Sequence, residues 1–287
     1  MSKATTPPSL ASWQAVNRSE QQVTINASNC CLPGHVNSSS AIDAFYGSVA
    51  EVMKLGDPQA LAQNETLGRL LILGIVTVTE TYFRSVIAAM VRLCPLAGTC
   101  ASDQQIAFGA LEFYGASELG LSLLEGISFT STSEVKKATK SLLGLELTAD
   151  ESLMAALESF NQVCSMRHAV VHDHGRINRG NAKVLGLRPQ VGRSLRLVVD
   201  LPNFHTAASA CTNVVRAYNG FLWRRTIQRW IDAQLLRGEW QLDKDNFGRL
   251  FRLLHSSPDN TGPSNAYRAY LSVRPSIAKR LANQSPL

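Results

Sequence analysis

Residues 64–93 read NETLGRLLILGIVTVTETYFRSVIAAMVRL, and this stretch decides the fold class. Its apolar residues recur at helical spacing and reach most of the way round the helix: Leu67, Leu71, Ile75, Val78, Tyr82, Val86 and Met90. Because a helix that is apolar on so many sides must bury several faces, we expect it at the centre of a domain. The uncharged run between Arg69 and Glu80 has ten residues, about half of a membrane-spanning helix, so no membrane span is expected.

Further periodic segments extend this core on both sides. The sequence predicts five more helices, over residues 41–55, 103–125, 133–143, 150–173 and 203–236. Pro202-Asn203 is expected to begin the last of them, with Asn203 as its N-cap. Segments 183–187 and 193–200 alternate between apolar and polar residues with turn residues between them, which predicts a β-hairpin.

These patterns predict an all-α fold, a helical bundle with a small β-hairpin before the last long helix. We expect an N-terminal arm with a short helix (1–58), a helical domain (59–237) and a basic C-terminal tail with two short helices (238–287). The first twenty residues lack the apolar core of a signal peptide, and the six cysteines form no CxxC pair. The sequence therefore predicts a soluble cytoplasmic protein with reduced cysteines.

The charge is distributed unevenly along the chain. Residues 1–175 carry 10 Lys and Arg against 16 Asp and Glu, whereas residues 176–287 carry 18 against 6, which together give the net charge of +6. Most of the basic residues in the second segment are Arg, whose guanidinium groups match phosphate oxygens and stack on bases. Four of them are predicted to contact RNA: Arg176, Arg224, Arg225 and Arg229. In the alternative interpretation, the arginines are solvated and the apolar neighbours on the same helix are buried against the bundle: Tyr218, Phe221, Leu222 and Trp230.

Residues 164–178, CSMRHAVVHDHGRIN, carry the candidate chemistry. The apolar stripe of the predicted 150–173 helix reaches Cys164, and helical spacing then places Arg167 on the same face. An Arg on a core face needs a partner, because an unpaired buried charge is costly. Glu80 lies on an apolar face of the 64–93 helix, so we expect Glu80 and Arg167 to meet between the two helices.

Two histidines follow Arg167 near the end of the same predicted helix. His168 lies one turn before His172, and His172 lies five residues after Arg167. An Arg that holds a phosphate and a His that moves protons near neutral pH are the minimum equipment for cleaving a phosphodiester without a metal.

The segment Arg167-His168-Ala169-Val170-Val171-His172 resembles the Arg-x4–6-His motif of the HEPN superfamily. The order of elements over residues 60–237 is also similar, with an acidic residue in a first long helix and the motif at the end of a later one. The resemblance implies a homodimeric, metal-independent endoribonuclease of the toxin or anti-phage effector type, with no cofactor. It implies products with a 2′,3′-cyclic phosphate and a 5′-hydroxyl, and an antitoxin or sensor protein as a possible partner.

The same resemblance assigns roles to four residues. His172 would act as general acid or base, Arg167 would hold the scissile phosphate, His168 would orient His172 or the substrate, and Glu80 would position Arg167.

Two alternatives stay open. His168 and His172 have the spacing of a helical zinc pair, with His174 as a third ligand, but Ala169 stands where a zincin needs its Glu. In the second alternative, the chain is a catalytically inactive HEPN module that serves in dimerisation, as an adaptor or in RNA binding.

Overall fold

The computed structural model describes residues 21–32, 34, 39–188, 194–259 and 261–282. The chain divides into two units, residues 1–38 and residues 39–287. In the described part of the first unit, Ala27–Cys30 form a short 3-10 helix (η2), which the side chain of Asn26 caps. All the other elements belong to the second unit, so the residues of the expected C-terminal tail pack together with those of the helical domain.

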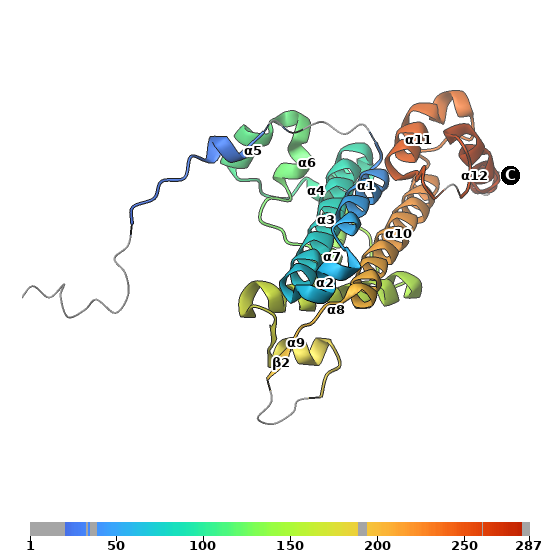
Figure 1. Cartoon of the computed structure of the whole chain (residues 1–287). Helices are drawn as coiled ribbons and strands as arrows, with labels where there is room; N and C mark the ends of the chain where they lie inside the picture. Colours follow the sequence, from blue (N-terminus) through green and yellow to red (C-terminus); the bar gives the residue numbers. More distant parts are fainter. Residues whose placement is uncertain (1–20, 33, 35–38, 189–193, 260, 283–287) are drawn as a thin grey trace, which may run out of the picture. The chain divides into compact units, whose positions relative to one another are not determined.

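Three long helices form the centre of the second unit: α3 (Glu65–Leu93), α8 (Glu151–Asp173) and α10 (Leu201–Asp232). The ring of Phe83 on α3 joins them, because its centroid lies 5.9 Å from Phe160 on α8 and 5.0 Å from Tyr218 on α10. All three rings are fully buried. The prediction of a central 64–93 helix is therefore confirmed, and α3 and α10 run side by side (Figure 1).

Smaller helices cover these three, and all of them come from the second unit. They are α1 (Ala41–Lys54), α2 (Pro58–Gln63), α4 (Pro95–Ala101), α7 (Thr132–Leu143), α11 (Trp240–Leu254) and α12 (Ala266–Ala282). Within the described ranges α3 alone is long and apolar enough to cross a membrane, and half of its most apolar 18-residue stretch is buried inside this unit. The all-α expectation is confirmed, with one two-stranded sheet in the described residues.

The predicted helix over 103–125 is wrong as a continuous element. The structure divides the segment into α5 (Phe108–Tyr114), a 3-10 turn η3 (Ala116–Glu118) and α6 (Leu119–Ser122). Gly115 separates them with φ 69° and ψ 174°, a conformation that only glycine adopts readily. The helices α2 and α4 were not predicted, although each begins with a proline in its first turn, where proline is favoured.

The β-hairpin exists, but its first strand lies earlier in the chain than predicted. Strand β1 (Arg176–Ile177) pairs antiparallel with β2 (Leu195–Arg196), with Arg176 opposite Arg196. The segment predicted as the first strand belongs instead to α9 (Arg179–Val184) and the turn after it. Asn178 starts α9 by accepting a hydrogen bond from the amide of Asn181 (2.9 Å), which satisfies one of the free amides of a first turn.

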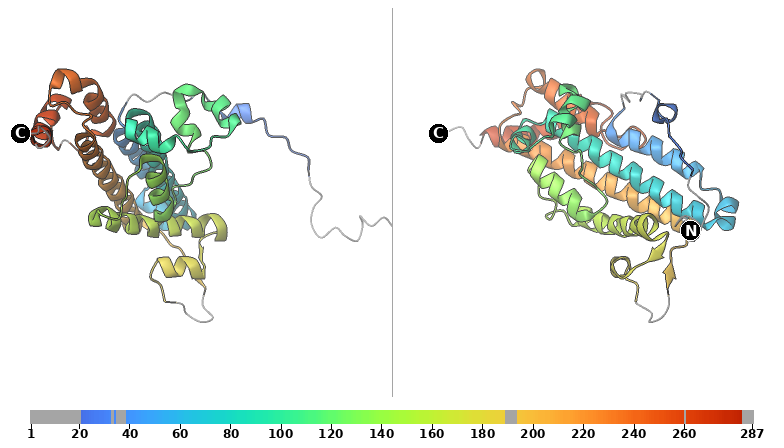
Figure 2. Two further views of the ribbon diagram at one scale, coloured as in Figure 1. Left: turned by 180° about the vertical axis from the view of Figure 1, so that it is seen from behind. Right: turned by 90° about the vertical axis from the view of Figure 1, so that its left-hand side faces the viewer.

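The N-cap of α10 also differs from the prediction. Asp200, and not Asn203, caps the helix, because its carboxylate accepts a hydrogen bond from the Asn203 amide (2.9 Å). The hairpin and α9 lie at one end of α10, whereas α11 and α12 lie at the other (Figure 2). This arrangement decides which of the predicted site residues come together.

Candidate active site at the end of helix α8

The final two turns of α8 present the two predicted histidines to solvent. His168 and His172 are both exposed, and their rings lie 4.3 Å apart between centroids, as expected for positions one turn apart. Arg167 is half-buried. Within the described ranges its guanidinium forms no hydrogen bond or ion pair, so its donors are available to another molecule.

The expected pair between Glu80 and Arg167 does not form. Glu80 accepts a hydrogen bond from the amide of Phe129 (3.1 Å) and lies 3.6 Å from the guanidinium of Arg84, one turn along α3. Both Glu80 and Arg167 nevertheless lie near the Cys164 thiol. Burial raises the pKa of Cys164, the charge of Glu80 raises it further, and the charge of Arg167 lowers it.

The end of α8 is fixed by an arginine that the sequence interpretation missed. Arg69 on α3 is 7% exposed, and its Nη1 donates to the carbonyl oxygen of His174 (2.8 Å). Glu65 pairs with Arg69 (3.5 Å) and also with Arg196 of the hairpin (3.0 Å). The position of Arg69 in an otherwise apolar stretch was the signal that could have identified it, since a buried Arg needs polar partners.

The turn that follows α8 depends on this contact. His174 adopts the left-handed conformation with φ 51°, and the amide of Gly175 closes the helix on the carbonyl of Ala169 (2.9 Å). Gly175 has φ 85° and packs against Arg69, so that a Cβ there would lie 2.8 Å from Arg69 Cδ. The chain thus leaves α8 in a defined direction, directly into β1.

The predicted RNA-binding arginines fall into two groups. Arg176 is exposed in β1, two residues after His174 and opposite Arg196, so the hairpin places basic side chains beside the end of α8. Arg224 instead pairs with Asp150 (2.7 Å), the residue that caps the first turn of α8. Arg225 lies over the ring of Phe221.

The second group is therefore far from the histidines. His172 lies twenty-one positions after Glu151 along α8, which corresponds to roughly 30 Å. Arg229, the third member, donates to the carbonyl of Leu143 at the end of α7. Within one chain, the predicted RNA-binding arginines of α10 therefore do not lie beside His172. Tyr218 and Trp230 are buried, as the alternative interpretation expected.

The pair between Asp150 and Arg224 predicts an acid-dependent contribution to stability. The hydrogen bond from the Leu153 amide, followed by that from Arg224, lowers the pKa of Asp150 below its ordinary value, although burial opposes the shift. A lowered pKa in the folded state means that this stability is present above about pH 4 and is lost as the pH falls through the folded value.

Asp150→Ala is expected to destabilise the protein by about 0.5–2 kcal/mol at pH 7, the usual cost of losing an N-cap. Asp150→Asn is the control, because Asn can cap the helix but cannot titrate. Urea denaturation from pH 3 to pH 7 should give a difference between wild type and Asp150→Asn that shrinks towards low pH. A difference that is constant over this range would contradict the assignment.

The end of α8 thus combines an unpaired guanidinium, two adjacent exposed imidazoles and the arginines of the hairpin. Such a group can bind a phosphate and transfer protons. In the described residues, no three His, Cys, Asp or Glu side chains are placed to hold a metal ion. No family model, curated protein sequence or solved structure matches this chain.

Proposed function

We propose that this protein is a metal-independent endoribonuclease of the HEPN type. The observation that carries the proposal is the half-buried guanidinium of Arg167, which has no partner among the described residues, on the same helix end as the exposed pair His168 and His172. An Arg without an ion-pair partner can bind a phosphate without first breaking an ion pair. The arginines of the hairpin add positive potential where RNA would approach.

In the proposed reaction the 2′-hydroxyl of RNA attacks the adjacent phosphorus. A histidine removes the proton of this hydroxyl, and a second histidine donates a proton to the departing 5′-oxygen, so that the P–O5′ bond breaks as the new P–O2′ bond forms. Arg167 offsets the negative charge that develops on the phosphate. The products are a 2′,3′-cyclic phosphate and a 5′-hydroxyl. We place this activity in a toxin or anti-phage effector, which a partner protein restrains until it is needed.

The test of this function is a cleavage assay with single-stranded RNA in excess EDTA, followed by analysis of the product ends. We expect cleavage with 5′-hydroxyl ends and cyclic phosphates. Products with 5′-phosphate ends, or cleavage only after a divalent metal is added, would contradict the mechanism. Binding of RNA without cleavage would favour the alternative of an adaptor or RNA-binding module.

The geometry of α8 leads to a prediction about assembly. Five helical residues correspond to about 500°, so Arg167 and His172 point about 140° apart around the helix axis. One chain therefore does not present both on a single face, whereas a two-fold dimer can bring Arg167 of one copy to His172 of the other. Sedimentation of the active protein should give about twice the chain mass of 31.3 kDa. A monomer whose specific activity stays constant on dilution to nanomolar concentration would exclude this composite site.

A further inference from the structure

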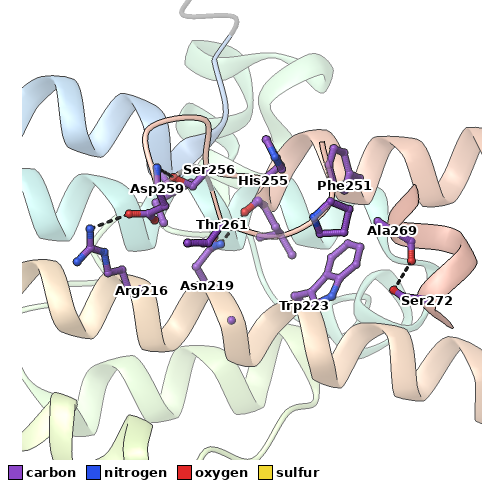
Figure 3. Close-up of a pocket in the computed structure, with 14 residues that line it drawn as sticks. Arg216, Asn219, Trp223, Phe251, His255, Ser256, Asp259, Thr261, Ala269 and Ser272 are labelled. Atoms are coloured by element: carbon purple, nitrogen blue, oxygen red, sulfur yellow. Dashed lines mark hydrogen bonds and ion pairs between the residues drawn. The ribbon is translucent and has the colours of Figure 1, made fainter. Parts of the chain in front are cut away.

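A cavity of about 710 Å³ lies between α10 and the C-terminal helices, away from the end of α8 (Figure 3). Its floor is one face of α10, formed by Arg216, Asn219, Gly220 and Trp223. These residues have the spacing of neighbours on one side of a helix. The other walls come from α11, from α12, from the turn between them and from Ile42 of α1. The volume is within the range of sites that enclose small organic ligands, roughly 300–1,000 Å³.

The turn that roofs this cavity is held in place by part-buried and exposed polar contacts. Asp259 accepts hydrogen bonds from the hydroxyl of Tyr46 and from Nη2 of Arg216, both at 2.7 Å. Arg216 Nε also donates to the Tyr46 hydroxyl (2.7 Å), and the amide of Ser257 donates to Asp43 (3.1 Å). The roof is therefore tied to both α1 and α10, and a ligand would meet a preformed site.

The walls combine aromatic rings with neutral polar groups. Trp223 and Phe251 contact each other edge to face at 6.2 Å, and the ring of His255 lies 4.5 Å from Phe251. Within the described part of the chain, three polar side chains on the wall form no hydrogen bond: the indole N–H of Trp223, the imidazole of His255 and the hydroxyl of Thr261. Arg216 and Asp259, the charged groups of the lining, neutralise each other.

We propose that this cavity binds a purine nucleoside. The flat heterocycle would stack on one of the rings of Trp223 and Phe251 and meet the other with its edge, because the planes of the two rings stand 75° apart. Its nitrogen edge would pair with the unused imidazole of His255 and with the amide of Asn219. That amide donates one hydrogen to the Leu254 carbonyl (2.7 Å) and keeps a second. The hydroxyl of Thr261 would meet the ribose. Because the charges of the lining cancel, the site favours a neutral nucleoside over a nucleoside triphosphate.

The test is a calorimetric titration of the full chain carrying His172→Ala, so that the proposed nuclease chemistry does not interfere. The probes are adenosine, guanosine, cytidine and ATP. We expect saturable 1:1 binding of at least one purine nucleoside, with cytidine at least tenfold weaker and ATP no tighter. Failure of both purine nucleosides to bind at millimolar concentration, or binding of ATP alone, would overturn the proposal.

Two variants locate the binding. Trp223→Ala should weaken it at least tenfold, but Trp223 also packs on Phe247, so the variant can lose stability. Gly220→Leu avoids this difficulty, because the atom within 4 Å of a Cβ at Gly220 is Nη1 of Arg224, at 3.1 Å. This guanidinium is 62% exposed, so it can shift by a few tenths of an ångström and keep its pair with Asp150. Gly220→Leu should fill the space above the floor of the cavity, weaken nucleoside binding at least tenfold and leave the melting temperature no lower than that of the wild type. The matched control is Gly109→Leu in α5, where a Cβ meets open space. Equal affinity in Gly220→Leu and wild type would place the ligand elsewhere and overturn the proposal.

Discussion

His172→Ala is expected to reduce the rate of RNA cleavage by at least about 10²–10⁴-fold, the usual contribution of a general acid or base, without lowering the melting temperature. His172 is exposed, and its described contact is the ring of His168, so its removal leaves no buried group unpaired. Arg167→Ala should reduce the rate by about 10²–10³-fold, because it removes the charge that offsets the charge developing on the phosphate. It should not lower the melting temperature, because Arg167 has no partner in the described structure that the substitution would leave unpaired. Initial rates on single-stranded RNA and thermal melts measure the two effects.

The controls for these variants lie on other surfaces. His205→Ala removes an exposed His from the side of α10 that faces Val49 and Met53 of α1. Arg249→Ala removes an exposed Arg from α11. Both should keep the wild-type rate. Mixing inactive Arg167→Ala with inactive His172→Ala should restore part of the activity, since one site of a mixed dimer combines an intact Arg167 with an intact His172, and His168, which both variants keep, is the second histidine. Full cleavage by His172→Ala alone would show that the catalytic assignment is wrong.

The long helices were predictable because their apolar stripes are long. Most of the residues that the stripes of α3 and α8 placed in the core are buried, among them Tyr82 and Cys164, whereas Leu67 and Val78 are half-buried. The segment 183–187 was too short for its period to decide between strand and helix. A local hydrogen bond from the Asn181 amide to Asn178 decided it in favour of α9. Short elements therefore depend on capping contacts that periodicity does not reveal.

Some features of the candidate site could likewise be predicted from the sequence, and others could not. The position of Arg167, His168 and His172 at the end of α8 followed from the stripe and from the end of the helical pattern. The partner of Glu80 could not be predicted in this way. Periodicity shows which face of a helix is buried, but it does not show how far one packed helix is shifted along its neighbour. Here Phe83 meets Phe160, and Arg69 reaches His174, which sets the offset of α3 against α8. Glu80 instead contacts Arg84 on its own helix and the amide of Phe129, which lies in a loop that no pattern connected to Glu80.

Asp243 is expected to control the stability of the C-terminal part of the unit. This residue in the first turn of α11 is 3% exposed and accepts hydrogen bonds from the amides of Arg237 (2.9 Å) and Gly238 (3.0 Å) and from the hydroxyl of Tyr270 on α12 (2.6 Å). Burial and this last hydrogen bond raise the pKa of Tyr270, so the hydroxyl stays protonated and donates to the carboxylate. One carboxylate thus ties the turn after α10 to both C-terminal helices.

Asp243→Ala should lower the free energy of unfolding by about 3–5 kcal/mol. Each donor left without its charged acceptor costs about 1–3 kcal/mol, and the three losses overlap because the contacts share one side chain. Tyr270→Phe is the matched variant: it deletes one donor, keeps the ring that contacts Trp240 at 5.2 Å, and should cost about 1–2 kcal/mol. Urea denaturation followed by tryptophan fluorescence measures both. If Asp243→Ala costs no more than Tyr270→Phe, the amides of Arg237 and Gly238 find other acceptors.

Because α11 and α12 also wall the nucleoside cavity, Asp243→Ala should weaken purine binding in step with stability, whereas Gly220→Leu weakens binding alone.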